Sequence, residues 1–311
     1  MNGLNNMKTA LIIGGGGFIG HNLVKRLKSE GWSVAAVDLK LPEFEPSPAD
    51  DFILADATEW RIDKYYDRIY QLAADMGGAG HIFTGDNDAD IMTNSASINL
   101  NIAKQAKDKC GVIFYSSSAC VYSPEAAAKR AKEEDAYPAT PDSNYGWEKL
   151  FSERVYQAYA KNYGLNIRLA RFNNTYGPLS TYKGGREKSP AAICRKVIEH
   201  ELYGKEIEIW GDGQQVREFV YIDDLLDGIE AILQSDIKTP INIGPETNIT
   251  IDEMVRILTH DPVKHIDGPV GLQIRLTSYD IIKSLGWKPK VSIEEGLKRT
   301  YNWIQTQYET N

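Results

Sequence analysis

The sequence predicts an α/β fold, in which a doubly wound parallel sheet is followed by a smaller, mixed C-terminal part. Three observations support this prediction. Short apolar runs alternate with longer helical patterns in the first half of the chain, a glycine-rich turn joins the first run to the first helix, and the composition after Arg171 becomes rich in Gly, Asn, Pro and Thr. Such alternation is typical of a parallel sheet covered by helices on both faces.

Strands are predicted where short apolar runs are bounded by Gly, Asp or Ser. They are Thr9–Ile13, Ser33–Asp38, Phe52–Ala55, Arg68–Ala73, Val112–Ser116 and Asn166–Arg171. Longer patterns lie between them and predict helices. These helices are Phe18–Glu30, Ala89–Lys107 and Tyr145–Tyr163.

The second half of the chain predicts an irregular region with several helices. Phe172–Pro190 has the composition of an ordered loop. Thr250 with Glu253, and Ser292 with Glu295, have the spacing of a capping box, which marks the start of a helix. The predicted helices are Pro190–Glu201, Asp223–Gln234, Ile251–Leu258 and Ile293–Tyr308.

The composition argues against several classes of protein. The 311 residues carry a net charge of -8 and no basic block, so neither a nucleic-acid surface nor a membrane surface is expected. No apolar run approaches the roughly 20 residues of a membrane span, and Met1–Lys8 is too polar for a signal peptide. The 3 cysteines are far apart and the 5 histidines lack metal-ligand spacing, so no metal site is expected and a reducing compartment, the cytoplasm, is favoured.

The turn after the first strand predicts a dinucleotide site. Gly14, Gly17 and Gly20 stand where a tight turn, close approach to a pyrophosphate and close packing of helix on strand each favour glycine. Phe18 and Ile19 complete the first helical turn, whose main-chain amides would face the phosphates. This context predicts a Rossmann-type domain rather than a glycine-rich turn without a ligand.

An acidic residue at the end of the second strand indicates which dinucleotide binds. Asp38 can accept hydrogen bonds from both ribose hydroxyls and would repel a 2′-phosphate, so NAD is favoured over NADP. Asp56 is expected either to meet the adenine or to be a solvated loop residue, and Ala73 is expected beside the cofactor. The NAD-binding domain is placed at residues 7–171 joined by 216–243, and the substrate-binding part at 172–215 and 244–311.

Tyr145 and Lys149 form a Tyr-x-x-x-Lys pair at the start of a long helix, one turn apart on the same face. A nearby ammonium group and a nicotinamide cation would lower the pKa of Tyr145, whose phenolate could then take a proton from a substrate hydroxyl. Ser118, in the stretch that ends the fifth strand, could hydrogen-bond the same hydroxyl. The pair alone is common by chance, but its place after this strand indicates a catalytic role.

These motifs, with the later segments Arg171–Pro178 and Arg217–Asp224, resemble the extended short-chain dehydrogenase/reductase family of nucleotide-sugar epimerases and dehydratases over nearly the whole chain. The resemblance implies a nucleotide-sugar substrate and a catalytic triad of Ser118, Tyr145 and Lys149. It also implies a homodimer formed through a four-helix bundle, to which two of the long helices could contribute.

A finer resemblance, to the GDP-mannose 3,5-epimerases of this family, lies in three stretches. They are Leu72–Gly78, Ser118–Cys120 and Lys183–Ala192. In such a reaction oxidation at C4 makes the protons on C3 and C5 acidic, and an acid–base pair inverts both carbons. The resemblance assigns this pair to Cys120 and Lys188, with Lys183 as the alternative to Lys188. From the residues alone, a single cysteine after a strand is usually a small buried hydrophobe. Its use as a base needs positive charge nearby, such as Lys188 or the oxidised nicotinamide, to lower the pKa of its thiol.

The resemblance also implies a set of substrate contacts. Arginine suits a diphosphate because its fork can bond two oxygens at once, which favours Arg217 and Arg275. The predicted set is Gly78, Ser118, Ala119, Cys120, Asn174, Glu187, Lys188, Ser189, Lys196, Gln215, Arg217 and Arg275. The chain departs from the family's usual pattern at Asn173, Tyr182 and Ser189, so a GDP-hexose is favoured but the sugar and the nucleotide stay open.

Two other functions are open at this point. A nucleotide-sugar 4-epimerase or 4,6-dehydratase could use the same scaffold, but the dehydratases of the family carry an Asp-Glu pair where this chain has Ala119 and Cys120. A 4-epimerase needs no second acid–base pair, which would leave Cys120 and Lys188 idle. A non-catalytic NAD-binding scaffold would tolerate the loss of Tyr145 or Lys149, yet both are present.

Overall fold

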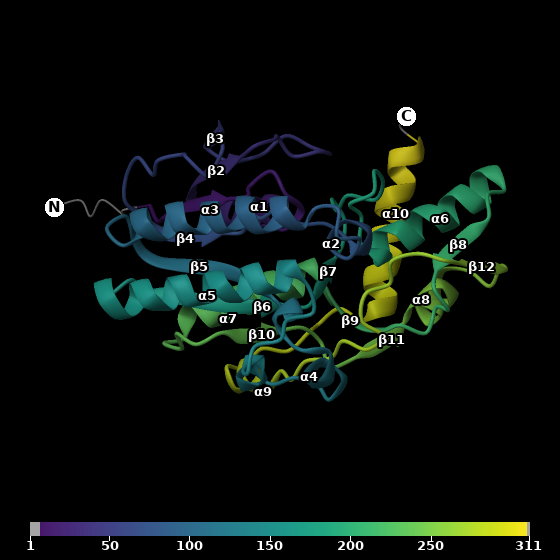
Figure 1. Ribbon diagram of the computed structural model, residues 1–311. Coiled ribbons are helices and arrows are strands. Elements are labelled where there is room, and N and C mark those ends of the chain that lie inside the picture. Colours follow the sequence, from purple (N-terminus) through teal and green to yellow (C-terminus); the bar gives the residue numbers. More distant parts are fainter. Residues whose placement is uncertain (1–6, 310–311) are drawn as a thin grey trace.

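Seven parallel strands form the central sheet of the computed structural model, which describes residues 7–309 (Figure 1). In sheet order they are β10 (Ile241–Ile243), β6 (Ile167–Phe172), β5 (Cys110–Ser118), β4 (Tyr66–Gln71), β1 (Thr9–Ile13), β2 (Ser33–Asp38) and β3 (Asp51–Leu54). Every neighbouring pair is parallel. The predicted doubly wound α/β fold is therefore confirmed, and six of its strands lie within about two residues of their predicted bounds.

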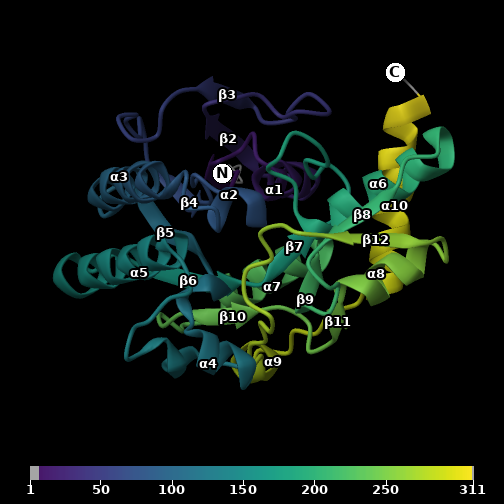
Figure 2. The ribbon, with the colours of Figure 1, turned by 45° about the vertical axis from the view of Figure 1, so that its right-hand side comes forward.

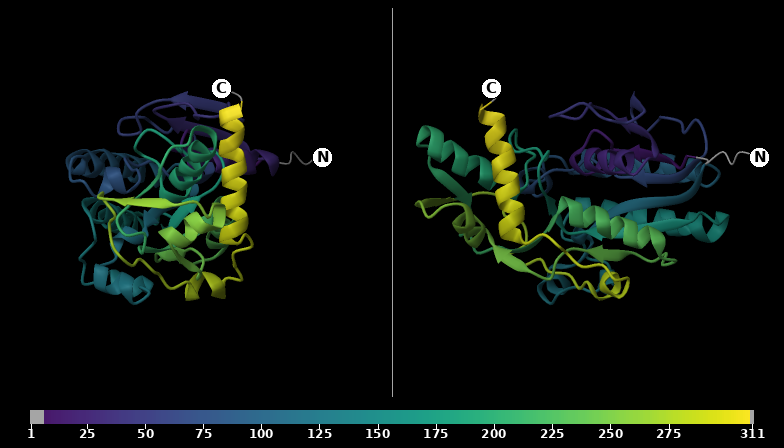
Figure 3. Two further views of the ribbon diagram at one scale, coloured as in Figure 1. Left: turned by 90° about the vertical axis from the view of Figure 1, so that its right-hand side faces the viewer. Right: turned by 180° about the vertical axis from the view of Figure 1, so that it is seen from behind.

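Helices cover both faces of this sheet. α3 (Asp88–Ala106) and α5 (Asn144–Tyr163) pack side by side on one face (Figure 1). α1 (Phe18–Ser29) and α7 (Ile222–Gln234) lie on the other face, which Figure 3 shows from behind. Strands between two helical layers are buried on both sides, and all residues of β6 are buried accordingly.

The C-terminal part stands beside the end of the central sheet (Figure 2). One small sheet has the order β11 (Asn248–Thr250), β9 (Val216–Tyr221) and β7 (Asn174–Tyr176), and another pairs β12 (Val263–Ile266) with β8 (Ile207–Trp210). Three longer helices pack around them, namely α6 (Ser189–Tyr203), α8 (Ile251–Leu258) and α10 (Ile293–Glu309). The short helices are α2 (Ala79–Ile82), α4 (Pro124–Ala128) and α9 (Asp280–Ser284).

The second half differs from the sequence prediction in two respects. The loop predicted at Phe172–Pro190 contains a strand, β7, which pairs with β9 far along the chain, with Asn174 opposite Phe219. A three-residue strand with so distant a partner leaves no local pattern in the sequence. The predicted extension 216–243 is divided between the two parts. β9 belongs to the second sheet, whereas β10 pairs with the central sheet and α7 packs against it. The domain boundaries therefore stay a prediction, while the predicted helices are all present within about two residues.

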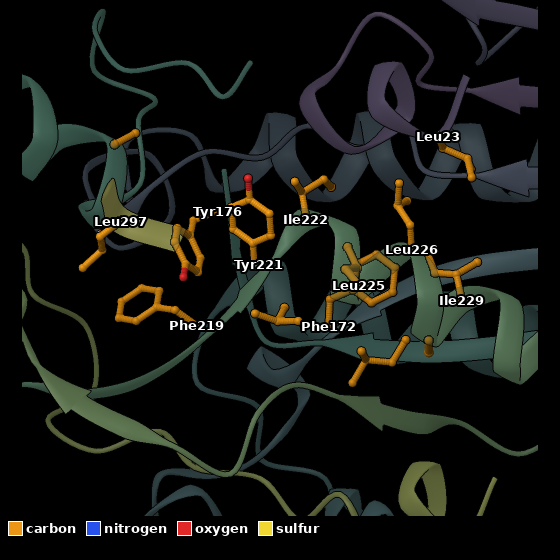
Figure 4. Packing of buried hydrophobic residues seen from close by; sticks show 14 of the residues in the cluster. Leu23, Phe172, Tyr176, Phe219, Tyr221, Ile222, Leu225, Leu226, Ile229 and Leu297 are labelled. Carbon is orange, nitrogen blue, oxygen red and sulfur yellow. The ribbon is translucent and has the colours of Figure 1, made fainter. Parts of the chain in front are cut away.

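One apolar cluster joins the two parts of the molecule (Figure 4). It runs from Leu23 of α1 past α7 and Phe172 of β6 to Tyr176 of β7, Phe219 of β9 and Leu297 of α10. The rings of Tyr176 and Phe219 meet edge to face with their centroids 6.2 Å apart. This shared core holds the C-terminal part against the ends of the central strands.

The strand order places a binding crevice next to β1. β1 pairs with β4 on one side and with β2 on the other, so the order of the strands reverses there. Ligands of open α/β sheets bind outside the carboxyl ends of the strands at such a point. The glycine turn begins there, and the main-chain amide of Gly14 donates to the oxygen of Val37 at 2.8 Å.

The helices of the described residues provide no membrane span, since none combines the length and the apolar character that crossing requires. The polar start Met1–Lys8, for which the sequence predicts no signal peptide, lies mostly outside the described residues.

Candidate active site

A cavity of about 420 Å³ lies between the central sheet and the C-terminal part. It is lined by every predicted catalytic residue and every predicted substrate residue. The catalytic set is Ser118, Cys120, Tyr145, Lys149 and Lys188. The other substrate residues are Gly78, Ala119, Asn174, Glu187, Ser189, Lys196, Gln215, Arg217 and Arg275. The fold thus brings these segments together around one cavity.

The turn between β1 and α1 has the features that a dinucleotide requires. α1 begins after Gly17, and no side chain caps its first main-chain amides, which leaves them for a phosphate. A Cβ atom on Gly20 would lie 2.0 Å from the main-chain oxygen of Gly14, so only glycine lets the helix start this close to the turn. Ile19 lines the main cavity, while Gly17 and Phe18 line a second, small pocket. The residues present therefore fit NAD.

The two predicted acidic contacts of the cofactor differ in their surroundings. Asp38 is partly buried, and its oxygens accept hydrogen bonds from the amides of Gly16 at 2.9 Å and Lys40 at 3.2 Å. Each carboxylate oxygen has further capacity as an acceptor, so the geometry is compatible with a ribose. Asp56 is exposed and accepts from the amide of Thr58 at 2.8 Å, a turn contact that accounts for this residue without a ligand.

Ala73 is held beside the glycine turn by Gln71. The Gln71 amide nitrogen donates to the main-chain oxygen of Ala73 at 2.9 Å, and the Ala73 amide donates back to Gln71 Oε1 at 3.2 Å. The main-chain nitrogen of Ala73 lies 2.7 Å from the position that a Cβ atom on Gly14 would take. Ala73 thus forms part of the wall around the turn.

Tyr145 and Lys149 are both buried at the start of α5. Lys149 Nζ lies 5.5 Å from the centre of the Tyr145 ring and donates to the main-chain oxygen of Ser116 at 2.9 Å. Burial raises the pKa of Tyr145, and a hydrogen bond with Ser118 only partly offsets it. The predicted lowering of this pKa by Lys149 is therefore not found in the protein alone, because desolvation of the phenolate outweighs the nearby charges.

Cys120 is 5% exposed and lies in the 3-10 turn Ala119–Val121, among Ile82, Ile91 and Tyr145. Its amide donates to Ser118 Oγ at 3.2 Å, which fixes the turn. Burial raises the pKa of the thiol, and the positive charge of Arg275 opposes this more strongly than that of Lys188. The sequence makes a base role for Cys120 conditional on nearby positive charge, such as Lys188 or the oxidised nicotinamide. In the protein alone burial outweighs the positive charge, and Arg275 contributes more of that charge than Lys188.

The structure distinguishes the two lysines that the sequence leaves as alternatives. Lys188 directly precedes α6, is partly buried and lines the cavity; burial lowers the pKa of its ammonium group. Lys183 is exposed, lies over the Tyr182 ring and is not among the lining residues. The segment that carries Lys188 is fixed by Gly78, whose amide donates to the oxygen of Arg186 at 3.1 Å. A Cβ atom on Gly78 would lie 2.2 Å from the oxygen of Glu187, so a larger residue would displace this segment.

The cavity is rich in positive charge although the chain as a whole is acidic, with a net charge of -8. Among the described residues that line it, Glu187 is the single acidic side chain. The basic ones are Lys149, Lys188, Arg195, Lys196, Arg217 and Arg275. A local positive site of this kind suits a ligand with a diphosphate group.

The basic side chains are held by other parts of the protein. Lys196 Nζ donates to the main-chain oxygen of Glu208 at 2.5 Å. Arg217 donates to the main-chain oxygens of Val270, at 2.9 Å, and Leu272. Its role as a diphosphate ligand stays a prediction, since a diphosphate would share the guanidinium group with these oxygens.

Sequence reasoning missed Asp142, whose carboxylate forms an ion pair with Arg275. No motif contains Asp142, and its partner lies far along the chain, so only the fold reveals the pair. Among the departures from the family pattern, Asn173 and Ser189 line the cavity. Tyr182 does not, because it is buried between the rings of Phe44 and Trp303.

Comparison with known proteins identifies relatives that match this chain over most of its length. GDP-mannose 3,5-epimerase of Arabidopsis thaliana is 39% identical over 322 residues, which cover 98% of this chain and 84% of that protein. GDP-mannose 3,5-epimerase 1 of Oryza sativa subsp. japonica is 40% identical, with coverage of 96% and 82%. UDP-glucuronic acid decarboxylase 1 of Xenopus tropicalis is 27% identical, with coverage of 97% and 73%.

Solved structures share the fold. UDP-glucose 4-epimerase of Thermotoga maritima, solved with UDP-glucose, superposes with a TM-score of 0.86 at 24% identity, covering 96% of this chain and 99% of the other. UDP-glucuronic acid 4-epimerase of Bacillus cereus, solved with UDP-glucuronic acid and NAD, gives 0.79 at 24% identity, with coverage of 96% and 100%. A family model for the NAD dependent epimerase/dehydratase family matches residues 10–244. The chain therefore belongs to the NAD-dependent epimerase/dehydratase family.

Proposed function

We propose that this NAD-dependent enzyme is a GDP-mannose 3,5-epimerase. One observation carries the proposal: the cavity holds a second pair of proton-transfer groups, Cys120 and Lys188, besides Tyr145. Inversion at C4 alone requires no such pair. The similarity to two GDP-mannose 3,5-epimerases at 39% and 40% identity supports the same substrate.

The residues at the start of α5 serve the C4 hydroxyl. NAD, when bound, supplies the hydride acceptor that makes C4 a ketone and afterwards returns the hydride. Tyr145 takes the proton of the hydroxyl and gives it back, and Ser118 hydrogen-bonds the same oxygen. Lys149 is anchored on Ser116 and holds its positive charge over the Tyr145 ring, which stabilises the phenolate as it forms.

Cys120 and Lys188 serve the two carbons beside the ketone. Inversion requires one group to remove a proton from C5 or C3 and another to deliver a proton to the opposite face. Burial raises the pKa of the Cys120 thiol and lowers the pKa of the Lys188 ammonium. These two shifts bring the proton affinities of the thiol and the amine closer together, which favours transfer of a proton by either group.

The proposal is tested by incubating GDP-mannose with the enzyme in deuterated water. We expect deuterium at C3 and C5, located by NMR and mass spectrometry. Cys120→Ala should reduce incorporation by roughly 10²-fold or more, the usual contribution of a positioned proton-transfer group. The variant should still bind NAD and exchange hydride at C4, because Tyr145, Ser118 and Lys149 are intact.

Cys110→Ala is the matched control. Cys110 begins β5, is partly exposed and is not among the lining residues, so this variant should label both carbons at the normal rate. Absence of label at both carbons with the unaltered enzyme would contradict the 3,5-epimerase function. Normal labelling by Cys120→Ala would contradict the role of the thiol.

The preference for a guanine nucleotide is also a proposal. Gln215 lines the cavity and is buried, and its Oε1 atom has no hydrogen-bond partner within the described residues. A buried, unpaired acceptor favours a ligand that donates. Guanine offers adjacent donors in its N1–H and amino groups, whereas uracil offers the N3–H alone. GDP should therefore raise the melting temperature more than UDP at equal concentration; the reverse order would contradict this preference.

A homodimer is the assembly that the surface supports. α3 and α5 pack side by side and carry exposed apolar side chains on their outer faces. These are Met92 and Leu100 on α3 and Trp147 and Phe151 on α5. Two copies could bury these faces in a four-helix bundle, and sedimentation analysis should show twice the monomer mass. A monomer at micromolar concentration would contradict it.

We infer the cytoplasm as the compartment. All 3 cysteines are free thiols in the structure. Free thiols persist in a reducing environment, which supports this location. Fluorescence imaging of the tagged protein would check it.

A further inference from the structure

Asp142 occupies a position between two groups of the active site. It lies in the segment that precedes α5, and its side chain is 0% exposed. Its main-chain amide donates to the oxygen of Cys120 at 3.3 Å. Gly146 approaches the same oxygen so closely that a Cβ atom there would lie 2.1 Å from it. The turn that carries Cys120 is thus packed against the start of α5, and the amide of Asp142 provides one of the contacts.

The carboxylate of Asp142 has two partners. Its Oδ2 atom pairs with the guanidinium group of Arg275, whose side chain is 8% exposed. Its Oδ1 atom accepts a hydrogen bond from Ser143 Oγ at 2.7 Å. A buried arginine without such a partner would be strongly unfavourable, so Asp142 fixes where Arg275 lies.

Arg275 in turn lines the same cavity as the acid–base pair. Its positive charge lowers the pKa of Cys120, against the larger effect of burial, and contributes to lowering the pKa of Lys188. The charged and titratable groups that act on Cys120 come from several elements. They are Tyr145 and Lys149 of α5, Lys188 before α6, Arg217 of β9, Arg275 after β12 and Asp142 before α5. Asp142 is the single carboxylate in this set, within the residues that the structure describes.

We propose that Asp142 is a positioning residue for the inversion chemistry: it holds Arg275 beside Cys120 and balances its charge, and so sets the pH at which the proton moves between Cys120 and Lys188. This role rests on the proposed function only in that Cys120 and Lys188 perform the inversion. Asp142 itself does not contact the reacting carbons in the proposal.

The direction of the effect follows from the charges. The negative charge of Asp142 raises the pKa of Cys120, and the positive charge of Arg275 lowers it. Asp142→Asn removes the negative charge and keeps an oxygen that can accept from Arg275. The pKa of Cys120 should then fall by on the order of one pH unit, so the thiolate should form at lower pH. Below the midpoint this corresponds to about tenfold more thiolate at a given pH.

The test measures Cys120 directly in the NAD-saturated protein without substrate. Iodoacetamide alkylates the thiolate, and mass spectrometry of the Cys120 peptide gives the rate at each pH. For Asp142→Asn we expect the profile to move to lower pH with about tenfold faster alkylation below the midpoint. Asp142→Glu, which keeps the charge, should stay close to the unaltered protein. If the Asp142→Asn protein does not fold, Asp142→Ser provides a second variant without the negative charge.

Glu230→Gln is the matched control, because it removes a carboxylate that pairs with Arg68 away from the cavity. It should leave the profile unchanged. An unchanged profile in both neutral variants of Asp142 would overturn the proposal, as would an equal shift in Asp142→Glu. A purely structural role would change the rate without moving the profile. Because no nucleotide sugar is present, a shift with an enzyme that fails to label C3 and C5 would support the positioning of Arg275 beside Cys120 by Asp142 and would reject only the inversion chemistry.

Discussion

The cofactor turn and the sugar end of the cavity are built in different ways. The turn is made from one short segment, in which the main chain of Gly14, Gly17 and Gly20 provides both the shape and the donors. The sugar end is made from side chains of distant segments, with Cys120 after β5 and Lys188 before α6. A site built from the main chain of one segment depends on a few adjacent residues. A site built from buried charges forms only when the fold brings distant segments together.

The same contrast holds for electrostatics. Asp38, beside the turn, is partly exposed and bonded to main-chain amides. Cys120 and Lys188 have pKa values that burial shifts in opposite directions, and Arg275 acts on both. Hydrogen-bond geometry therefore determines how the cofactor turn binds its ligand. The balance between desolvation and neighbouring charge determines the protonation of the groups at the sugar end.

The largest expected effect comes from Gly20→Ala in the cofactor turn. The added Cβ atom would lie 2.0 Å from the main-chain oxygen of Gly14, so the turn must open. We expect loss of measurable NAD binding by calorimetry and a decrease of roughly 1–3 kcal/mol in the free energy of unfolding.

Gly17→Ala is the control in the same turn, because its Cβ atom would meet only the oxygen of Gly14 at an ordinary 3.5 Å. It should keep the stability of the unaltered protein. If Gly17→Ala also loses NAD while remaining stable, the turn faces the ligand as proposed. If Gly20→Ala binds NAD normally, close packing of the Gly20 main chain on Gly14 is not required for NAD binding.

A second, smaller effect tests the sugar end. Lys188→Met should reduce deuterium incorporation at C3 and C5 by roughly 10²–10⁴-fold, because inversion loses one of its two proton-transfer groups. Lys183→Met should stay near the normal rate, since Lys183 is exposed and is not among the lining residues. NMR of both variants in deuterated water decides between them, and the opposite order would assign the role to Lys183.

The sequence was sufficient for the parts that depend on local pattern. The alternation of strands and helices and the glycine turn were predictable because each is written in a few adjacent residues, as Thr9–Ile13 and the start of α1 at Phe18 illustrate. β7 was not predictable, because its pairing with β9 is non-local. The membership of the cavity was inferred by resemblance, and the structure places all those side chains on one lining.

The electrostatic state of the site could not be predicted. Residue types alone indicate that nearby positive charge would lower the pKa of the Cys120 thiol. The burial that raises this pKa depends on Ile82 and Ile91, which pack around Cys120 only in the fold. The ion pair of Asp142 with Arg275 likewise requires two segments to meet in the fold. Charge effects of this kind follow from tertiary packing and leave no mark on residue spacing.

The smallest expected effect concerns a strap, residues 39–50, that runs from β2 to β3 past the cofactor turn. Glu43 of the strap accepts a hydrogen bond from Thr181 Oγ1 at 2.9 Å. Phe44 stacks on Tyr182, with ring centroids 5.6 Å apart, and meets Trp303 of α10 edge to face at 4.8 Å. The strap thus ties the NAD-binding side of the molecule to the C-terminal part.

Phe44→Ala should loosen this tie. Because Phe44 is only partly buried, the free energy of unfolding should fall by about 1–2 kcal/mol, and NAD should dissociate about tenfold faster, as followed by the fluorescence of a bound analogue. Leu41→Ala, on the same strap but 58% exposed, should change neither quantity. Labelling at C3 and C5 under saturating NAD should stay normal in Phe44→Ala, because the strap does not line the main cavity. A Phe44→Ala protein that retains NAD normally but loses labelling would show instead that the two sites are coupled through α10. The cofactor turn, built from main chain, and the sugar end, built from buried charges, would then not act independently in this enzyme.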